Sequence, residues 1–188
     1  LIRYDELFHK IALEKNLIPK NIAVDKNAVR NHLRKHDQED EWTCIQGEVY
    51  GSRIGDAKPF EGMFETLKTI QSRGVRLLLV SHKTARPYLG PQYDLHDAAQ
   101  NWLRKQGFFK PAGLHWLKNQ VFFELTKTEK IKRILTLGCT HYVDDLPEIL
   151  EMLPETICRI QFAPKSCKKN TYPWPLIRSW EELPSLLQ

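Results

Sequence analysis

The sequence predicts an α/β fold in which helices cover both faces of a parallel β-sheet, with a small helical region at its start. After residue 60, short apolar segments alternate with amphipathic segments of about ten to fifteen residues, which is typical of parallel strands joined by helices. Residues 1–60 instead place apolar side chains at helical spacing and show no strand pattern. We therefore expect two domains, a helical one over residues 1–60 and an α/β one over residues 61–188.

Composition and charge exclude several classes of protein. The chain has 188 residues, of which 41% are hydrophobic and 27% charged, and its formal net charge is +5. This composition is ordinary for a globular protein, and the most apolar stretch, residues 75–80, is far shorter than the ~20 residues of a membrane-spanning helix. The four cysteines lack CxxC spacing, which favours reduced thiols in a cytoplasmic protein. We expect no membrane partner, and nucleic-acid binding only as a minor alternative.

Helix signals divide the first region into successive elements. Apolar residues at helical spacing predict a helix over residues 5–17, which Pro19 ends, and Asp25 is the expected N-cap of a second helix that runs to residue 36. Residues 42–50 lead into a glycine-containing loop at 51–55.

The α/β region is assigned in the same way. The expected helices cover residues 63–73, 94–106, 127–137, 147–152 and 180–187. The expected strands cover residues 75–80, 120–123, 141–143 and 157–162, with a short edge strand at 176–178. In a parallel sheet, ligands bind beyond the carboxyl ends of the strands, so the residues at those ends are the functional candidates.

Two adjacent carboxylates, Asp144 and Asp145, follow the strand at 141–143. Adjacent carboxylates repel each other unless a cation lies beside them, and oxygen ligands suit Mg²⁺. The alternative is an N-cap, with Asp145 or Leu146 at the cap position of the helix that begins near Pro147. Because one residue is enough for a cap, we favour a metal site at Asp144 and Asp145.

Ser81 and two lysines are the other candidates at strand ends. Ser81 follows the strand at 75–80, where a hydroxyl and the backbone N–H groups of a turn suit a phosphate oxygen, and a local cap is the equal alternative. Thr126 and Glu129 form the pattern of a capping box, so Lys127 and Lys130 lie in the first helical turn. A cation there opposes the helix dipole, which suggests an anionic partner, although a solvated surface is the default for either lysine.

These residues resemble the motifs of the haloacid dehalogenase-like (HAD) hydrolase superfamily. The resemblance covers residues 60 to 163 and consists of an apolar strand ending in Ser81, a helix start at Lys130-Ile131, and a strand ending in Asp144-Asp145, in the superfamily's order. It implies a Rossmann-like core with a helical cap, Mg²⁺ dependence and phosphatase activity. By this resemblance Ser81 and Lys130, or else Lys127, contact the phosphoryl group, and Asp144 and Asp145 hold the metal, with Glu148 as a weaker candidate nearby.

The superfamily's first motif, Asp-x-Asp-x-Thr, does not occur in the sequence. We expect the first core strand, with the nucleophilic aspartate, directly upstream of Leu1, because a parallel sheet without its central strand leaves backbone groups unpaired.

Substrate contacts are expected from the cap and from the loop after Ser81. For the cap we select Tyr50 and Arg53, since an aromatic ring with a nearby guanidinium suits an anionic or ring-bearing compound, and a turn with a buried tyrosine is the alternative. For the loop we select His82 and Lys83, which either contact the substrate or shape the entry to the helix at Asp94.

The function expected is therefore hydrolysis of a small phosphorylated metabolite through an aspartyl-phosphate intermediate. The alternatives are a nucleic-acid-end phosphatase or a non-catalytic phosphate-binding relative, in which the basic segment 165–169 contacts a phosphate backbone. A carbon–halogen hydrolase needs no Mg²⁺, so the carboxylate pair argues against that activity.

Overall fold

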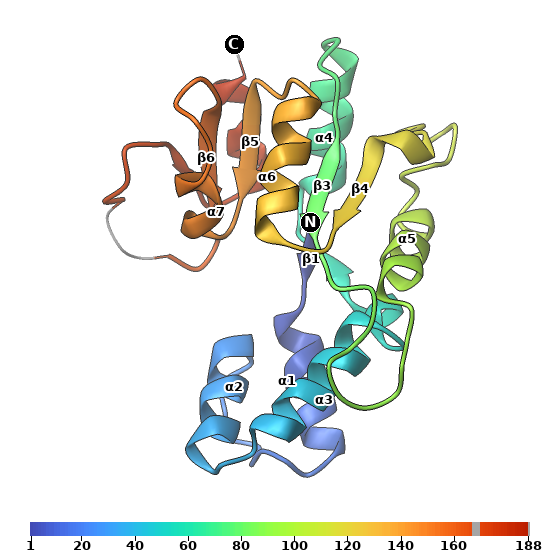
Figure 1. The fold of residues 1–188 in the computed structure, drawn as a ribbon, viewed down its shortest axis with the longest axis vertical. Coiled ribbons are helices and arrows are strands. Elements are labelled where there is room, and N and C mark those ends of the chain that lie inside the picture. The colour runs from blue at the N-terminus through green and yellow to red at the C-terminus, as the bar shows by residue number, and fades with distance from the viewer. Residues whose placement is uncertain (167–169, 188) are drawn as a thin grey trace. The chain divides into compact units, whose positions relative to one another are not determined.

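The computed structural model describes residues 1–166 and 170–187 (Figure 1). The chain forms two compact units, which we describe separately. Unit 1 contains Leu1–Phe60 and Lys83–His115, and unit 2 contains Glu61–His82 and Trp116–Gln188. The first boundary lies where we placed the domain boundary, whereas Lys83–His115, expected in the α/β domain, belongs to the first compact unit. The functional assignment of a cap and a core stays a prediction.

Unit 1 is mainly helical. Its elements are β1 (Ile2–Arg3), α1 (Asp5–Glu14), α2 (Lys26–Lys35), α3 (Glu39–Tyr50), the 3-10 helix η1 (Ile54–Asp56), β2 (Lys58–Pro59) and α5 (Leu95–Lys105). Asp25 caps α2 as expected, because its side chain accepts a hydrogen bond from the backbone N–H of Ala28 at 2.9 Å. Asp94 caps α5 in the same way, through the N–H of Asp97.

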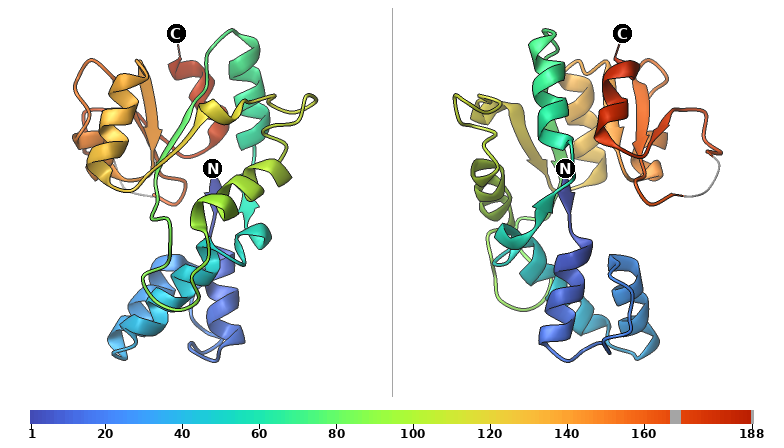
Figure 2. Two further views of the ribbon diagram at one scale, coloured as in Figure 1. Left: turned by 45° about the vertical axis from the view of Figure 1, so that its right-hand side comes forward. Right: turned by 180° about the vertical axis from the view of Figure 1, so that it is seen from behind.

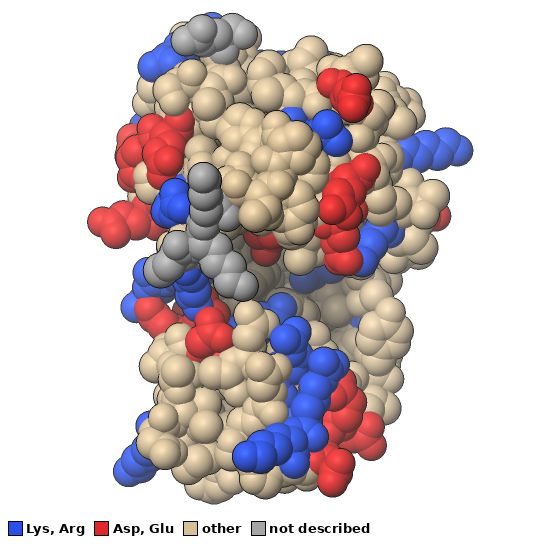
Figure 3. Space-filling view, turned by 90° about the vertical axis from the view of Figure 1, so that its left-hand side faces the viewer, with Lys and Arg blue, Asp and Glu red and all other residues tan. Residues whose placement is uncertain are grey.

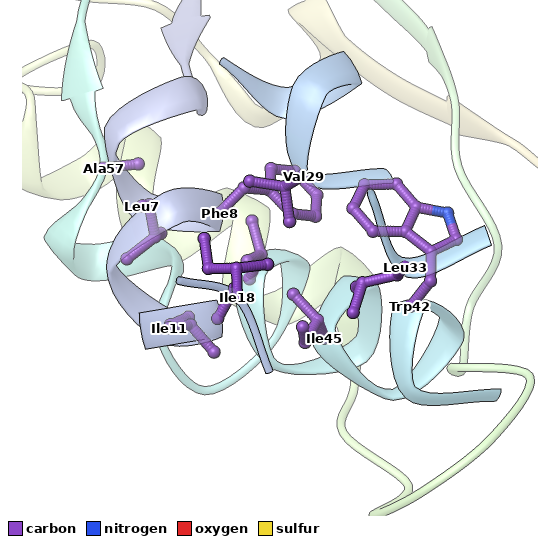
Figure 4. Packing of buried hydrophobic residues seen from close by; sticks show 11 residues of the cluster. Leu7, Phe8, Ile11, Ile18, Val29, Leu33, Trp42, Ile45 and Ala57 are labelled. Carbon is purple, nitrogen blue, oxygen red and sulfur yellow. The ribbon is translucent and has the colours of Figure 1, made fainter. Parts of the chain in front are cut away.

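Apolar side chains from α1, α2 and α3 form the core of unit 1 (Figure 4). The ring of Phe8 stacks on that of Trp42, with 4.9 Å between ring centroids. Val29 and Leu33 on α2 are completely buried against this cluster. Helical periodicity therefore identified the inner faces of α1 and α2 correctly.

The expectation that residues 1–60 contain no strand is wrong. β1 pairs antiparallel with β2, with Ile2 opposite Pro59 and Arg3 opposite Lys58. Ion pairs from both strands to Glu6 accompany this pairing, since Arg3 and Lys58 each contact its carboxylate. Strands of two residues are too short to show an alternating pattern, so only the long-range pairing reveals them.

Unit 2 carries the parallel strands. Its elements are α4 (Met63–Ser72), β3 (Leu79–His82), the 3-10 helix η2 (Lys118–Gln120), β4 (Val121–Glu124), α6 (Lys127–Thr136), β5 (His141–Asp144), α7 (Pro147–Glu151), β6 (Cys158–Phe162), β7 (Leu176–Ile177) and the 3-10 helix η3 (Trp180–Leu186). β3 and β4 form a two-stranded parallel sheet, and β5, β6 and β7 form a three-stranded one. The α/β class is therefore confirmed.

A side chain links the two parallel sheets of unit 2. The hydroxyl of Tyr142 in β5 donates a hydrogen bond to the backbone oxygen of Val80 in β3 at 2.6 Å. Burial, and then the negative charge of Asp144, raises the pKa of Tyr142. Around this link, Val80 shares one hydrophobic cluster with Ile131 and Ile134 of α6.

The helices α4 and η3 pack against each other within unit 2 (Figure 2). A guanidinium N–H of Arg73 donates to the backbone oxygen of Pro184 at 3.4 Å. The closing element, expected as a helix over residues 180–187, is a 3-10 helix with Pro184 inside it. Proline removes a backbone donor, so regular α-helical hydrogen bonding is not maintained there.

The strand expected at residues 75–80 begins later and ends later. β3 starts at Leu79, because its partner β4 starts at Val121, and it continues through Ser81 to His82. Before β3, the backbone oxygen of Leu77 accepts a hydrogen bond from the side-chain amide of Gln120 at 3.0 Å. A side chain thus takes the place of a strand partner there.

No helix within the described ranges combines the length and apolar character that crossing a membrane requires. The described cysteines, Cys44, Cys139 and Cys158, are free thiols, and Cys167 lies outside the described residues.

Replacing Tyr142 with Phe should lower the free energy of unfolding by about 1 kcal/mol, because the ring stays packed while the link to Val80 is lost. Urea unfolding measures this change. Tyr172→Phe is the matched control, since Tyr172 is exposed and should tolerate the substitution with a change within about 0.5 kcal/mol. Equal effects of the two substitutions would show that the hydroxyl link contributes nothing to stability.

Candidate functional site

A buried ion pair lies at the carboxyl end of β5. The ammonium group of Lys130 donates to Oδ2 of Asp144 at 2.6 Å, and only 8% and 7% of the two side-chain surfaces are exposed. The second carboxylate oxygen, Oδ1, accepts the backbone N–H of Leu146 at 3.0 Å. Removing both charges from water is costly, so the pair requires the close geometry and the additional hydrogen bond that it has here.

The start of α6 places Lys130 in this pair. Thr126 is the N-cap, its hydroxyl accepts the N–H of Glu129 at 3.1 Å, and the Glu129 carboxylate accepts the N–H of Thr126 at 3.1 Å. The predicted capping box is therefore confirmed, and it fixes the residue at which the helix begins. Lys130 then shares the buried face of α6 with Ile131 and Ile134. Asp144 offsets the unfavourable position of a cation in the first helical turn.

Lys127 lies at the same helix start in a different environment. Its ammonium group donates to Oε1 of Glu148 at 2.7 Å, but 40% and 55% of these side chains are exposed. Solvent screens such a pair strongly, so its contribution to stability is small. The structure therefore separates the two candidate lysines: Lys130 contacts the aspartate pair, and Lys127 contacts Glu148.

Asp145 is exposed beside the buried pair. Loss of hydration at its carboxyl group, and then the charge of Asp144, raises the pKa of Asp145. Leu146 occupies the N-cap position of α7, and no side chain makes a cap hydrogen bond there. Asp144 makes the local bond to Leu146, so the capping alternative does not account for Asp145.

Ser81 and His82 lie within β3, opposite Phe123 and Glu124 of β4. The turn expected directly after Val80 is therefore absent at these two residues, because both continue the strand. Side chains alternate along a strand, so His82 shares the face of the buried Val80, and Ser81 lies on the other face. No hydrogen bond joins Ser81 to Lys130 or to the aspartates among the residues that the structure describes.

His82, by contrast, is close to the charged groups of α6 and β5. Burial is the main cause that lowers the pKa of His82, and the positive charges of Lys130 and Lys127 lower it further. The charges of Asp144 and Glu148 act in the opposite direction. A neutral imidazole is therefore favoured beside the Lys130–Asp144 pair.

The donor chemistry of Asp144 and Asp145 is compatible with Mg²⁺. Mg²⁺ in phosphate-handling sites is held by one or two carboxylates and completes its shell with water and substrate oxygens. Both oxygens of Asp144 already accept hydrogen bonds, Oδ2 from Lys130 and Oδ1 from Leu146, so a metal ion would have to share them. The exposed Asp145 has a raised pKa, which a nearby cation would lower. Within residues 1–166 and 170–187, no group of three or more His, Cys, Asp or Glu side chains forms a ready-made metal site.

The substrate-contact candidates in unit 1 fall into two places. Lys83 lies with its ammonium group 4.7 Å from the centroid of the half-buried Tyr50 ring. Arg53 instead pairs with Glu14 at 2.9 Å and with Asp56 at 2.8 Å, and these bonds raise its pKa. Tyr50 and Lys83 therefore come together, whereas Arg53 is engaged in structural ion pairs.

Sequence reasoning missed Lys26, whose ammonium group donates to the Tyr50 hydroxyl at 2.7 Å. No local signal could have found this contact, because the two residues are 24 positions apart. The basic segment at 165–169 includes residues 167–169, which lie outside the described residues.

Comparison with known proteins adds no relative. No protein-family model matches the chain, and neither the curated proteins nor the solved structures gave a match.

The burial of the Lys130–Asp144 pair leads to a prediction about stability. Lys130→Met should lower the free energy of unfolding by about 3–5 kcal/mol, because Asp144 is left buried without its partner. Lys127→Met, the matched control at the same helix start, should cost less than about 1 kcal/mol. Urea unfolding at neutral pH compares the two variants, and similar losses would contradict the distinction between them.

Proposed function

We propose that this chain is a phosphoryl-transfer hydrolase, a Mg²⁺-dependent phosphatase of the HAD-like superfamily that acts on a small phosphorylated metabolite. The observation that carries the proposal is the buried Lys130–Asp144 pair at the end of a parallel strand, with the exposed Asp145 directly beside it.

The Lys130–Asp144 pair suggests a functional role, because a buried ion pair often adds little to the net stability of a protein. Replacing a buried ion pair by apolar side chains of similar volume is often neutral or stabilising. Here the lysine lies at a helix start, the aspartate at a strand end, and a second aspartate, Asp145, directly follows it. Ligands of parallel sheets bind at this end of the strands.

In the proposed reaction, Lys130 neutralises negative charge on the transferring phosphoryl group, which is the main requirement of phosphoryl transfer. Asp144 holds the ammonium group in position for that task. Ser81, whose side chain lies on the opposite face of β3 from that of His82, would supply a hydroxyl donor to a phosphoryl oxygen at the strand end, as the motif resemblance implies. His82 lies within the field of the same charges and would border the substrate as a neutral donor.

Asp145, with Asp144, would hold Mg²⁺, and the ion when bound would act as a Lewis acid on the phosphoryl oxygens. The raised pKa of Asp145 supports this role, because a carboxylate that is crowded by another carboxylate gains most from a neighbouring cation.

The proposal also requires an attacking carboxylate, which the resemblance places on a first core strand that carries the Asp-x-Asp-x-Thr motif. That strand would join the two parallel sheets of unit 2 into a single three-layer, Rossmann-like sheet. In support, β3 and β5 each have one hydrogen-bonded neighbour strand in the described residues, β4 and β6 respectively.

The test is a phosphate-release screen of the full-length protein with sugar, nucleotide and amino-acid phosphates, in the presence and absence of Mg²⁺. Asp145→Asn should lower Mg²⁺-dependent turnover at least about 100-fold, because it removes a charge from a metal ligand. Asp40→Asn, which changes an exposed aspartate in the first turn of α3, is the matched control and should leave turnover unchanged.

If Asp145→Asn hydrolyses the substrate as fast as the wild-type protein, the assignment of Asp145 to a metal site is wrong. Phosphate binding without any turnover would favour the alternative of a non-catalytic phosphate-binding relative. A steep loss of DNA or RNA binding with salt would favour the nucleic-acid-end alternative.

A further inference from the structure

Two lysines from different segments of unit 1 converge on one tyrosine. Lys26 begins α2, and its ammonium group donates to the Tyr50 hydroxyl at 2.7 Å and lies 5.3 Å from the centroid of the Phe8 ring. Lys83 approaches the Tyr50 ring itself, with its ammonium group 4.7 Å from the centroid. Tyr4 packs edge-on against Tyr50 from α1's N-cap position, so the ring is held between neighbours.

No ion pair joins Lys26 or Lys83 to a carboxylate of the described residues, although several other cations of unit 1 are paired. Lys15 pairs with Glu48 at 2.6 Å, Arg53 with Glu14, and Lys58 with Glu6. Asp5, on α1, uses its Oδ1 to accept the backbone N–H of Lys26 at 2.8 Å, where it satisfies the start of α2. Lys26, Lys83 and Tyr50, which we call the Tyr50 site, thus bring two ammonium groups together, and neither forms an ion pair with a carboxylate within residues 1–166 and 170–187.

This arrangement is electrostatically unfavourable without a ligand. Burial, and then the charge of Lys26, lowers the pKa of Lys83 to about 8. Contact with an aromatic face stabilises each cation, but it does not remove the repulsion between the two. Lysines that lose water are normally paired with a carboxylate, as Lys130 is with Asp144 in unit 2.

We infer that Lys26, Lys83 and the Tyr50 hydroxyl form a binding site for an anionic ligand that carries a phosphate or a carboxylate group. The Tyr50 oxygen accepts its hydrogen bond from Lys26, so its own O–H remains able to donate to an anion. Two ammonium groups and one hydroxyl would then surround the ligand, with the rings of Phe8 and Tyr50 beneath them. The use of this site to select a substrate rests on the proposed phosphatase function, whereas the anion binding itself does not.

NMR of the protein with ¹³C-labelled lysine tests the inference at the two residues themselves. Inorganic phosphate, added at constant ionic strength, should shift the Lys26 and Lys83 side-chain signals in a saturable manner and raise the pKa of Lys83 above about 8. Succinate is the second probe: stronger binding of phosphate assigns the site to phosphate groups, and stronger binding of succinate assigns it to carboxylates.

Variants separate this site from other phosphate contacts of the chain. Lys26→Met should weaken the response of Lys83, and Lys83→Met that of Lys26, by about 10- to 100-fold in affinity, because each removes one charged contact. Lys83→Arg should retain binding, since it keeps the charge. Lys35→Met, an exposed lysine on the same helix as Lys26, is the matched control and should change nothing. Far-UV circular dichroism confirms that each variant is folded.

The two proposals fail in different ways. Asp145→Asn should abolish turnover and leave the Lys83 response intact, so loss of enzymatic activity alone does not affect the anion site. If the Lys26 and Lys83 signals do not move at phosphate concentrations up to about 10 mM, or if Lys26→Met responds like wild type, the inference is wrong.

Discussion

The Lys130–Asp144 ion pair is the interaction on which the rest of unit 2 depends. It joins the start of α6 to the end of β5. The contact depends on α6 beginning at Lys127 and on β5 ending at Asp144. The capping box at Thr126 sets the start of the helix, and Asp144 also holds the backbone of Leu146 before α7. One carboxylate thus organises a helix, a strand end and the following turn. Asp145 directly follows Asp144, and loss of hydration together with the charge of Asp144 raises the pKa of the Asp145 carboxyl group.

Some Lys and Arg side chains form ion pairs with carboxylates, and others do not. Lys, Arg, Asp and Glu side chains are interspersed over much of the face shown in Figure 3, as expected for a net charge of +5. Several cations of unit 1, among them Lys15, Arg53 and Lys58, have a carboxylate partner, whereas Lys26 and Lys83 contact the Tyr50 ring. In unit 2, the buried Lys130 has a carboxylate partner, Asp144, at 2.6 Å. Pairing offsets the cost of burying a charge, and the half-buried Lys83 has instead a lowered pKa and a contact with the Tyr50 ring.

Strand boundaries show where local pattern and long-range pairing diverge. Residues 75–80 have the composition of a buried strand, yet the ladder covers only Leu79–His82, because pairing depends on where β4 begins. The strands β1 and β2 had no recognisable pattern at all and exist only through their mutual hydrogen bonds. Helices were located more accurately, since capping residues and helical spacing are properties of consecutive residues. For the same reason the α/β class followed from the sequence, whereas the division of the parallel strands between two sheets did not.

The sequence by itself determined the helix starts at Asp25, Asp94 and Thr126 and the position of the aspartate pair after a strand, because each depends on residues close together in the chain. Only the tertiary structure decided which lysine contacts that pair. It also showed that Arg53 is held in ion pairs and that Lys26 reaches Tyr50, 24 residues away. These contacts depend on which helix faces pack together, and packing is a property of the whole unit. The chemistry of the site was therefore visible in its residue types, whereas the partners of its charged groups required the fold.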